Sequence, residues 1–573
     1  MNAYETYRLW LTSPALSEEE RAELRAIEGN EDEILSRFAS YLSFGTAGLR
    51  GTMKVGTGAM NVHTVAHATQ GLANLILKEG RAADGVVIAY DSRNNSPLFA
   101  RTAASVLAAN GIGVYLFDEL RPTPELSFAL RYLRCVAGIN ITASHNPKEY
   151  NGYKAYWEDG AQLPPEHAAV VSAEIGKLDV FNDVKRTDVD AAIREGKIRI
   201  IGAEIDEAYL REVLAQAINP DAIRAVADSL HIVYTPLHGA GYRLVPEILA
   251  RCGLRHLHPV AEQMTPDGNF PTVAKPNPEY PEVFTIGVAL ANEVGADLII
   301  ATDPDTDRVG VSTRRPDGSF TTITGNQMGA LLIDYIITAY EQTGTMPDEP
   351  YAVKTIVTSE MAAKICAAHG VKMYNVLTGF KFIGEVIKKH EEMGHGSFLF
   401  GFEESYGYLK GTYARDKDAV VATMLIAEMT AYYKAQNKTL FDALEELYAR
   451  YGFCMEKTAE LEMPGLDGPA RMAALMEKLR KDPPSAFNGL AVVTAGDYEA
   501  QTLTERKSGK VEPTGLPASN VLSFVLENGD VIVVRPSGTE PKVKFYYMLS
   551  GEERGAVEAN LAAYRAEIDE MTK

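Results

Sequence analysis

The sequence predicts an α/β protein of about four domains: three α/β domains, followed by a smaller α+β domain at the C-terminal end. Three observations lead to this prediction. The chain has 573 residues, and roughly 150 residues is a usual domain size. Short β-branched runs alternate with longer amphipathic segments through most of the chain, as in βαβ units with a mostly parallel sheet. From about residue 485 onward, closely spaced short strands replace this alternation.

Hydrophobic periodicity gives the individual elements. Helices are expected at 62–79, 97–110, 206–217, 284–294, 326–341 and 418–434, and strands at 86–89, 114–117, 136–142, 231–234, 297–301, 353–357 and 397–400. The C-terminal part is expected to hold strands at 490–494, 521–526, 531–534 and 543–548 before a final helix that begins near Glu553. We place the domains at 1–203, 204–322, 323–455 and 456–573.

The composition is that of a globular protein with a strong negative charge. Apolar residues make up 46% and charged residues 23%, which argues against disorder, collagen-like repeats and coiled coils. Lysine and arginine number 56 against 77 aspartates and glutamates, so the net charge is −21. Such a charge disfavours binding to nucleic acid or to anionic membranes. An anionic small-molecule substrate would need a local basic pocket.

The cysteines and the N-terminal segment indicate the compartment. The four cysteines lie more than 80 residues apart and form no C-x-x-C pair, so neither a zinc site nor a disulfide framework is expected. The first residues lack the basic and apolar regions of a signal peptide. No stretch of about 18 apolar residues is present. We therefore expect a cytoplasmic protein that does not span a membrane.

The first loop with chemical potential is Thr142-Ala143-Ser144-His145-Asn146-Pro147. It follows an apolar strand, and ligand-binding loops of α/β domains lie at the carboxyl ends of strands. Ser144 therefore lies at a strand tip beside His145, although a turn serine would fit the same pattern. The nucleophile elbow G-x-S-x-G of hydrolases does not occur.

The second loop, Asp303-Pro304-Asp305-Thr306-Asp307-Arg308, follows another apolar strand. Its spacing of two places three carboxylates on one side of an extended loop. At an effective dielectric constant near 20, two carboxylates about 4 Å apart repel by about 4 kcal/mol. A hard divalent cation relieves this repulsion, and Mg²⁺ suits a loop with few protein ligands. A solvated acidic turn is the alternative.

Two further loops offer polar groups for a sugar phosphate. Gly401-Phe402-Glu403-Glu404-Ser405-Tyr406-Gly407 holds carboxylates and a hydroxyl between glycines, a pattern that also fits an ordinary exposed turn. Arg535-Pro536-Ser537-Gly538-Thr539-Glu540-Pro541-Lys542 offers hydroxyls, backbone N–H groups and a guanidinium to a phosphate, or else is a hairpin turn. Residues 415–418 are interpreted as a charged helix start, and the pair His63 and His67 as helix-packing residues.

Taken together and in this order, the four loops resemble those of the α-D-phosphohexomutase family, and most of all its long phosphoglucomutase/phosphopentomutase branch. The likeness covers essentially the full chain, and Gly45-Thr46-Ala47-Gly48-Leu49-Arg50-Gly51 resembles the family's first motif. The resemblance implies a heart-shaped, phosphohexomutase-like architecture of four domains around a central cleft. It also implies interconversion of glucose 1-phosphate and glucose 6-phosphate, through a phosphoserine and a glucose 1,6-bisphosphate that also serves as activator.

The resemblance assigns roles to residues that match the family motifs. Catalytic roles are implied for Ser144 as the phosphoserine and for His145, Arg50, Lys154 and Lys381. The Mg²⁺ ligands would be Asp303, Asp305 and Asp307, with a further oxygen from the phosphate on Ser144. Substrate contacts are implied for Arg308, Glu403, Ser405, Arg535, Ser537, Gly538, Thr539 and Lys542. The general base stays open among Lys154, His145 and Lys381.

Several activities remain as alternatives. A phosphopentomutase, a phosphomannomutase or a glucose 1,6-bisphosphate synthase would use the same loops. A Mg²⁺-dependent sugar phosphatase would also use Ser144 and the acidic loop. A catalytically silent sensor would have lost a nucleophile or a metal ligand, and here both are present. The expected partners are small sugar phosphates, with the chain a monomer or a weak dimer.

Overall fold

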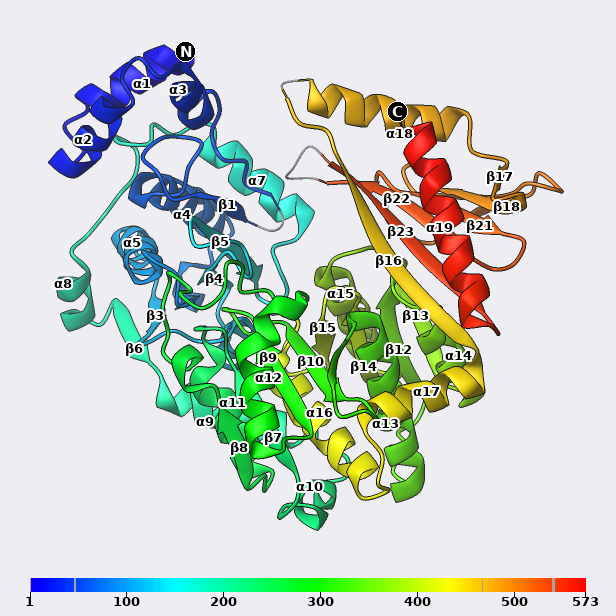
Figure 1. Cartoon of the computed structure of the whole chain (residues 1–573). Helices are drawn as coiled ribbons and strands as arrows, with labels where there is room; N and C mark the ends of the chain where they lie inside the picture. Colours follow the sequence, from blue (N-terminus) through cyan, green and yellow to red (C-terminus); the bar gives the residue numbers. More distant parts are fainter. Residues whose placement is uncertain (1, 46–47, 466, 538–541, 573) are drawn as a thin grey trace. The chain divides into compact units, whose positions relative to one another are not determined.

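The computed structural model, drawn in Figure 1, describes residues 2–45, 48–465, 467–537 and 542–572. The chain divides into two compact units. The first unit comprises the chain up to Ile323 together with Ile387–Glu392 and Gly407–Asn437. The second unit comprises Thr324–Val386, Met393–Tyr406 and the chain from Lys438 onward. Among the described residues, no helix is both long and apolar enough to span a bilayer.

The first sheet has the strand order β1-β5-β4-β2-β3-β6. Its strands are β1 (Leu49–Thr52), β2 (Val86–Tyr90), β3 (Val114–Phe117), β4 (Ala137–Ile141), β5 (Tyr150–Trp157) and β6 (Ile198–Ile201). The four strands β4, β2, β3 and β6 are parallel; at one edge β5 pairs antiparallel with β4, and β1 pairs antiparallel with β5. The flanking helices are α4 (Val62–Lys78), α5 (Ser96–Ala109), α6 (Thr123–Tyr132), α7 (Pro165–Ile175) and α8 (Val189–Arg194). Because helices cover both faces, β2 is apolar along nearly its whole length.

Three N-terminal helices precede this sheet: α1 (Ala3–Thr12), α2 (Glu18–Ala26) and α3 (Glu31–Phe38). Capping boxes at Asn2 and Ser17 begin the first two helices. Their apolar side chains surround Trp10, whose ring contacts the imidazole of His63. His63 Nε2 lies 2.9 Å from Glu20 Oε1, so this histidine is a buried packing residue, as expected.

The second sheet has the order β11-β10-β9-β7-β8. Its strands are β7 (His231–Thr235), β8 (His256–Pro259), β9 (Leu298–Thr302), β10 (Val309–Arg314) and β11 (Phe320–Ile323), and its helices are α9 (Ala203–Leu214), α10 (Asp221–Ala225), α11 (Gly241–Arg251) and α12 (Thr285–Val294). Strands β8, β7 and β9 are parallel, and β10 and β11 return antiparallel. Every residue of β9 is buried, as its central place in the sheet requires.

The third sheet holds β12 (Pro350–Thr355) between two parallel neighbours, β13 (Lys372–Val376) and β14 (Ser397–Glu403). The accompanying elements are α13 (Gly325–Thr343), α14 (Glu360–Ala368), α15 (Phe380–Met393), β15 (Gly407–Leu409), α16 (Ala419–Lys434) and α17 (Leu440–Tyr451). Strand β12 ends two residues earlier than the predicted strand 353–357. The backbone turns at Thr355, whose carbonyl accepts the N–H of Thr358, and Val357 packs from this turn into an apolar cluster.

The fourth sheet is antiparallel, with the order β16-β23-β22-β21-β18-β19-β20. Its strands are β16 (Phe453–Glu462), β17 (Ala486–Phe487), β18 (Leu490–Asp497), β19 (Thr502–Glu505), β20 (Val511–Pro513), β21 (Leu522–Leu526), β22 (Val531–Pro536) and β23 (Lys542–Gly551), and its helices are α18 (Gly468–Lys481) and α19 (Arg554–Met571). Both helices pack on one face, where they bury alternate residues such as Ile532 and Val534 (Figure 1). The opposite face presents Val533 and Tyr546 to Val357 and Leu377 of the third domain. Three α/β domains and one domain with an antiparallel sheet are therefore confirmed.

Helix α13 packs closely against β14 at one glycine. A Cβ atom on Gly329 would lie only 2.0 Å from the Phe402 ring, so the helix approaches the strand closely because this residue has no side chain. We expect Gly329→Ala to destabilise the second unit by about 1–3 kcal/mol through overpacking. Thermal unfolding followed by calorimetry measures this as a lower midpoint.

The matched control is Gly555→Ala in α19, where a Cβ would meet open space. That substitution should leave the midpoint unchanged or raise it, since alanine is favoured over glycine in helices by up to about 1 kcal/mol. Equal midpoints for the Gly329→Ala variant and the wild-type protein would contradict the close approach.

Candidate active site

The Ser144 loop leaves the carboxyl end of β4 and is strained at its central residue. Ser144 has φ 52°, in the left-handed region that non-glycine residues rarely adopt. Its backbone N–H donates to Thr142 Oγ1 at 2.8 Å, and the Thr142 hydroxyl donates to Asp91 Oδ2 at 2.6 Å. The Ser144 side chain is buried.

The buried side chain of Arg93 holds this loop in place. Arg93 is 1% exposed, and its two terminal nitrogens donate to four main-chain carbonyls of the loop. These carbonyls belong to Ser144, Asn146, Pro147 and Tyr150. Its Nε lies 3.3 Å from Asp91 Oδ2, and the ring of Phe270 lies against the guanidinium, 5.1 Å away. One side chain thus fixes the path of the loop from Ser144 to Tyr150.

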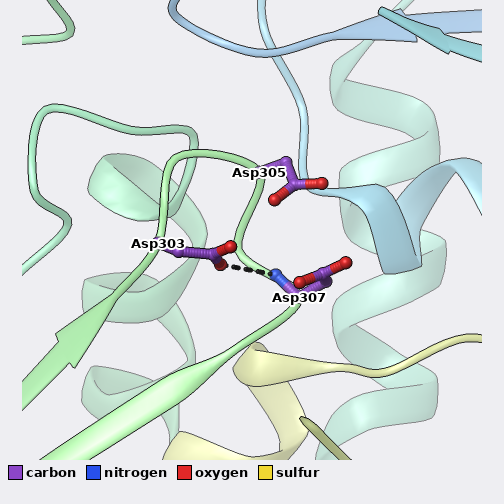
Figure 2. A group of neighbouring side chains, drawn as sticks. All are labelled: Asp303, Asp305 and Asp307. Carbon is purple, nitrogen blue, oxygen red and sulfur yellow. Dashed lines mark hydrogen bonds between the residues drawn. The ribbon is translucent and has the colours of Figure 1, made fainter. Parts of the chain in front are cut away.

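The acidic loop follows β9 directly and brings three buried carboxylates together (Figure 2). Ligand atoms of Asp303, Asp305 and Asp307 all lie within 4.8 Å of one another. Asp303 Oδ1 accepts the backbone N–H of Asp307 at 3.1 Å, as the dashed line in Figure 2 shows, and that of Arg308 at 3.0 Å. Thr306, with φ 56°, gives the loop its sharp turn.

Charge in this loop shifts the pKa values of two carboxyls in opposite directions. Burial, reinforced by the charges of Asp305 and Asp307, raises the pKa of Asp303 well above its usual value. Burial also acts on Asp307, but the nearby Lys154, Lys417 and Arg308 outweigh it and lower the pKa of Asp307. Among the described residues, Oδ1 of Asp305 and Oδ1 of Asp307 are buried without a hydrogen-bond partner. This donor set fits a divalent cation, which would satisfy both oxygens.

The two loops meet at Ser144. Its Oγ donates to Asp303 Oδ2 at 2.9 Å, and the same Oγ lies 3.2 Å from His145 Nδ1. Burial and the positive charges of Arg308 and Arg50 lower the pKa of His145 well below its usual value. The His145 ring is therefore neutral at pH 7.

Two lysines offset the negative charge of the acidic loop. Lys154, on β5, donates from Nζ to Asp305 Oδ2 at 2.7 Å and to Asp307 Oδ2 at 3.2 Å. Although burial acts against its charged form, these carboxylates raise the pKa of Lys154. Lys417 Nζ lies 3.3 Å from Asp307 Oδ2 and 2.8 Å from Asp416 Oδ1.

Two arginines that sequence analysis selected lie at the edge of this cluster. Arg308 pairs through Nη1 with Glu279 Oε1 at 2.6 Å, and its Nε lies 3.8 Å from Asp307 Oδ1. Arg50, exposed on β1, donates to Asn146 Oδ1 at 3.1 Å and so contacts the Ser144 loop. The first unit therefore gathers the following predicted residues: Arg50, Ser144, His145, Lys154, Asp303, Asp305, Asp307 and Arg308.

The other predicted residues belong to the second unit. Glu403, at the end of β14, is buried, and its Oε1 accepts the backbone N–H of Gly379 at 2.8 Å. Ser405 follows Glu403 in the turn before Tyr406, which has φ 67°. Lys381 lies in the first turn of α15, where burial lowers its pKa.

The β22–β23 hairpin carries the last set of predicted residues. Arg535 and Ser537 line an open pocket of about 390 Å³, together with Met472 and Met476 of α18. Ser537 N–H donates to the carbonyl of Lys542 at 2.8 Å and joins the two strands. Lys542 Nζ donates to Glu460 Oε2 at 2.9 Å. The remaining predicted contacts, Gly538 and Thr539, lie outside the described residues, as do Thr46 and Ala47 of the first motif.

Sequence analysis missed Arg93 and Lys417 as parts of this site. Arg93 follows the carboxyl end of β2, beside β4, and that position was an available signal. Lys417 stands in the segment interpreted as a charged helix start. Asp418 does cap α16, since its side chain accepts two backbone N–H groups, but Lys417 reaches Asp307.

Comparison with known proteins covers all four domains. Family models match residues 41–180, 207–318, 324–451 and 472–563; they are described as the α/β/α domains I, II and III and the C-terminal domain of phosphoglucomutase/phosphomannomutase. A phosphoglucomutase of Staphylococcus saprophyticus is 38% identical over 522 residues, which are 91% of this chain and 93% of the relative. A phosphoglucomutase of Staphylococcus aureus is 37% identical over 514 residues, 89% and 90% of the two chains.

Solved structures agree on the fold. The open form of parafusin, a phosphoglucomutase from Paramecium, superposes with a TM-score of 0.68 at 18% identity and covers 93% of this chain and 94% of its own. A phosphoglucomutase/phosphomannomutase family protein from Burkholderia thailandensis gives 0.65 at 18% identity, with 91% and 96% covered. With the four domain matches and the extended identity to curated relatives, the chain belongs to the α-D-phosphohexomutase family.

Proposed function

We propose that this protein is a phosphoglucomutase, which interconverts glucose 1-phosphate and glucose 6-phosphate. The observation that carries the proposal is the meeting of Ser144 Oγ with Asp303 Oδ2 at 2.9 Å, inside a cluster of three buried carboxylates. A hydroxyl at a strained strand tip beside a cation site is the arrangement that phosphoryl transfer through a phosphoserine needs. The names of the staphylococcal relatives support glucose as the sugar.

In the proposed reaction, the phosphoryl group on Ser144 moves to the free hydroxyl of a sugar monophosphate. The P–O bond to Ser144 breaks as a P–O bond to the sugar oxygen forms, and the hydroxyl proton passes to a base. The resulting glucose 1,6-bisphosphate turns end for end and returns its other phosphoryl group to Ser144. Added bisphosphate would keep Ser144 phosphorylated and so act as activator.

The acidic loop would hold Mg²⁺ through Asp303, Asp305 and Asp307, with a further oxygen from the phosphate on Ser144. The unpartnered Oδ1 atoms of Asp305 and Asp307 support this assignment, and an all-oxygen donor set suits Mg²⁺. When bound, the ion would offset charge on the transferring phosphoryl group.

Of the three candidate bases, two are favoured. Lys154 is kept protonated by Asp305 and Asp307, so it is better suited to stabilise negative charge on the phosphoryl oxygens. Burial lowers the pKa of Lys381 below that of an ordinary lysine, which suits a proton acceptor. It also keeps the His145 ring neutral, with Nδ1 3.2 Å from Ser144 Oγ. Arg50 and Arg308 would bind phosphoryl oxygens near Ser144.

Recognition of the rest of the substrate is assigned to the second unit. Glu403 and Ser405 would accept and donate hydrogen bonds to sugar hydroxyls. Arg535, Ser537, Gly538 and Thr539, with Lys542 as a weaker addition, would bind the phosphate that is not reacting. The pocket lined by Arg535 and Ser537 supports this role, whereas the pairing of Lys542 with Glu460 makes it the least supported member.

Location, assembly and domain limits complete the proposal. All four cysteines are buried and unpaired, which supports a reducing cytoplasm. We propose a monomer or weak dimer that acts on small sugar phosphates, with domain limits near 203, 322 and 455.

A substrate panel tests the activity. Glucose, mannose, ribose and deoxyribose 1-phosphates are supplied with and without glucose 1,6-bisphosphate, and the products are identified. We expect glucose 6-phosphate to form fastest. Preference for a pentose or mannose substrate would indicate a phosphopentomutase or a phosphomannomutase instead. Release of inorganic phosphate faster than isomerisation would indicate a phosphatase.

We expect Ser144 to carry a phosphate in the active protein, because its hydroxyl is the nucleophile in the proposed reaction. Peptide mapping by mass spectrometry should locate the phosphate at this residue. Ser144→Ala should lose at least roughly 10³-fold in turnover. Ser172→Ala is the control: it removes from α7 a hydroxyl that donates to the Phe44 carbonyl at 3.0 Å, and it should keep both the phosphate and the activity. A fully active Ser144→Ala variant would rule out the mechanism.

Asp305→Asn should weaken Mg²⁺ binding at least roughly tenfold, because one anionic ligand becomes a neutral amide of the same shape. Titration calorimetry measures the affinity, and circular dichroism checks the fold. Asp317→Asn in the exposed turn between β10 and β11 is the matched control and should bind Mg²⁺ like the wild type. Equal affinity in the Asp305→Asn variant, or full activity with a strong chelator, would refute a required metal at this loop.

Arg93→Met should lower kcat by roughly 100-fold and leave KM for glucose 1-phosphate little changed. Its four carbonyl contacts position Ser144 without touching substrate, and small misplacements of reacting groups cost about this much. Arg93→Lys should rescue only part of the rate, since an ammonium cannot reach all four carbonyls. Arg101→Met, on the exposed face of α5, is the control. A change in KM alone would contradict the positioning role.

A further inference from the structure

Three imidazoles share one face at the edge of the second sheet. His231 begins β7, and His256 and His258 lie on the neighbouring strand β8, which is the edge strand. His256 and His258 are two residues apart on a strand, so their side chains project from the same face. His231 pairs directly with His256 in the parallel register, which brings its side chain to that face as well.

The three rings are in direct contact. The His231 ring is stacked on that of His256, with centroids 4.3 Å apart and planes 12° apart. The centroids of His231 and His258 lie 5.2 Å apart, and Nδ1 of His231 is hydrogen-bonded to Nε2 of His258 at 3.1 Å, so one of these two nitrogens donates its N–H to the other. All three residues are half-buried, so solutes can reach the rings from solvent.

The cluster differs in its charge environment from the other histidines. His63, His167 and His369 each lie within ion-pair distance of a glutamate. In the described part of the chain, no carboxylate lies within ion-pair distance of the three clustered rings. The nearby Asp297 accepts the backbone N–H of His231 and pairs with Lys434, so it is engaged elsewhere. Burial, together with its two neighbours, lowers the pKa of His258, so its ring is neutral at pH 7.

We propose that His231, His256 and His258 form a binding site for a divalent transition-metal ion of the Zn²⁺ class. Imidazole nitrogen suits Zn²⁺, Cu²⁺ and Ni²⁺, whereas Mg²⁺ requires oxygen ligands. Two nitrogens bound to one Zn²⁺, each about 2.0–2.1 Å from it in tetrahedral geometry, are about 3.4 Å apart. The hydrogen-bonded nitrogens of His231 and His258 lie 3.1 Å apart, close to this spacing, and a bound ion would replace the proton that they share. His256 joins as third ligand by turning its ring out of the stack, and water completes the shell.

This site is separate from the acidic loop. His231 lies at the amino end of β7, which runs parallel to β9, and Asp303 follows the carboxyl end of β9. The two sites therefore lie at opposite ends of the sheet, and the five residues of β9 alone span roughly 13 Å at about 3.3 Å per residue. Both sites can be filled at once, and occupancy of the histidine site does not depend on the proposed mutase reaction.

The test titrates the full-length protein with Zn²⁺ by calorimetry while saturating Mg²⁺ occupies the acidic loop. We expect one Zn²⁺ per chain, and each of His258→Gln and His256→Gln should weaken its binding at least about tenfold. His369→Gln, which removes a half-buried histidine paired with Glu341, is the matched control and should bind Zn²⁺ like the wild type. Equal Zn²⁺ affinity in the wild type and both cluster variants would overturn the proposal.

Two further measurements identify the ligands and check the fold. With Cu²⁺ as probe, the electron paramagnetic resonance spectrum should show hyperfine coupling to at least two nitrogens, and this coupling should be lost in His258→Gln. A spectrum of oxygen ligation alone would overturn the proposal. Zn²⁺ should raise the thermal midpoint of the wild type at pH 7.5, but not that of His258→Gln or of the wild type at pH 5.5. Equal Zn²⁺-induced shifts in all three samples would also overturn it.

Discussion

The repulsion among three buried carboxylates is the constraint around which the first unit is organised. Asp303, Asp305 and Asp307 share a space less than 5 Å across, away from bulk water. Such a group is tolerated only when cations approach it closely. Lys154 arrives from an antiparallel strand of the first sheet, and Lys417 from the segment before α16. Three segments far apart in sequence must therefore meet at one loop, and their meeting joins the first two domains to that segment.

The Ser144 loop is also held by groups of opposite polarity, but here the polar groups are main-chain carbonyls. A left-handed residue at Ser144 costs free energy, and the loop around it exposes carbonyls that need donors. Arg93 supplies donors to four of them and is itself balanced by Asp91. Phe270, from the second domain, covers the guanidinium. Rigidity around the hydroxyl is thus a property of a network that crosses a domain boundary, rather than of the loop sequence alone.

Local patterns in the sequence were sufficient for much of the fold and for the acidic loop. The aspartates follow strand β9 directly, so the apolar run and the spacing of the carboxylates together predicted a strand with an acidic loop at its end. Strand β16 was not predicted, because charged and apolar residues are mixed from Glu456 onward. Its pairing with β23 is what makes this segment a strand. Lys417 and Arg93 escaped because their partners are more than 50 residues away. Long-range contacts of this kind leave no periodic signal.

The course of the chain has a consequence for anyone who wishes to divide this protein. The chain leaves the first unit after Ile323, returns for Ile387–Glu392, and returns again for Gly407–Asn437, which includes α16. A fragment that stops at a linear boundary near residue 323 would lack the helix that packs on α9, α10 and α11, and would expose their apolar faces. Large exposed apolar faces promote aggregation. Excision of a single α/β module therefore calls for fusing the residue 407–437 segment to it rather than for a simple truncation.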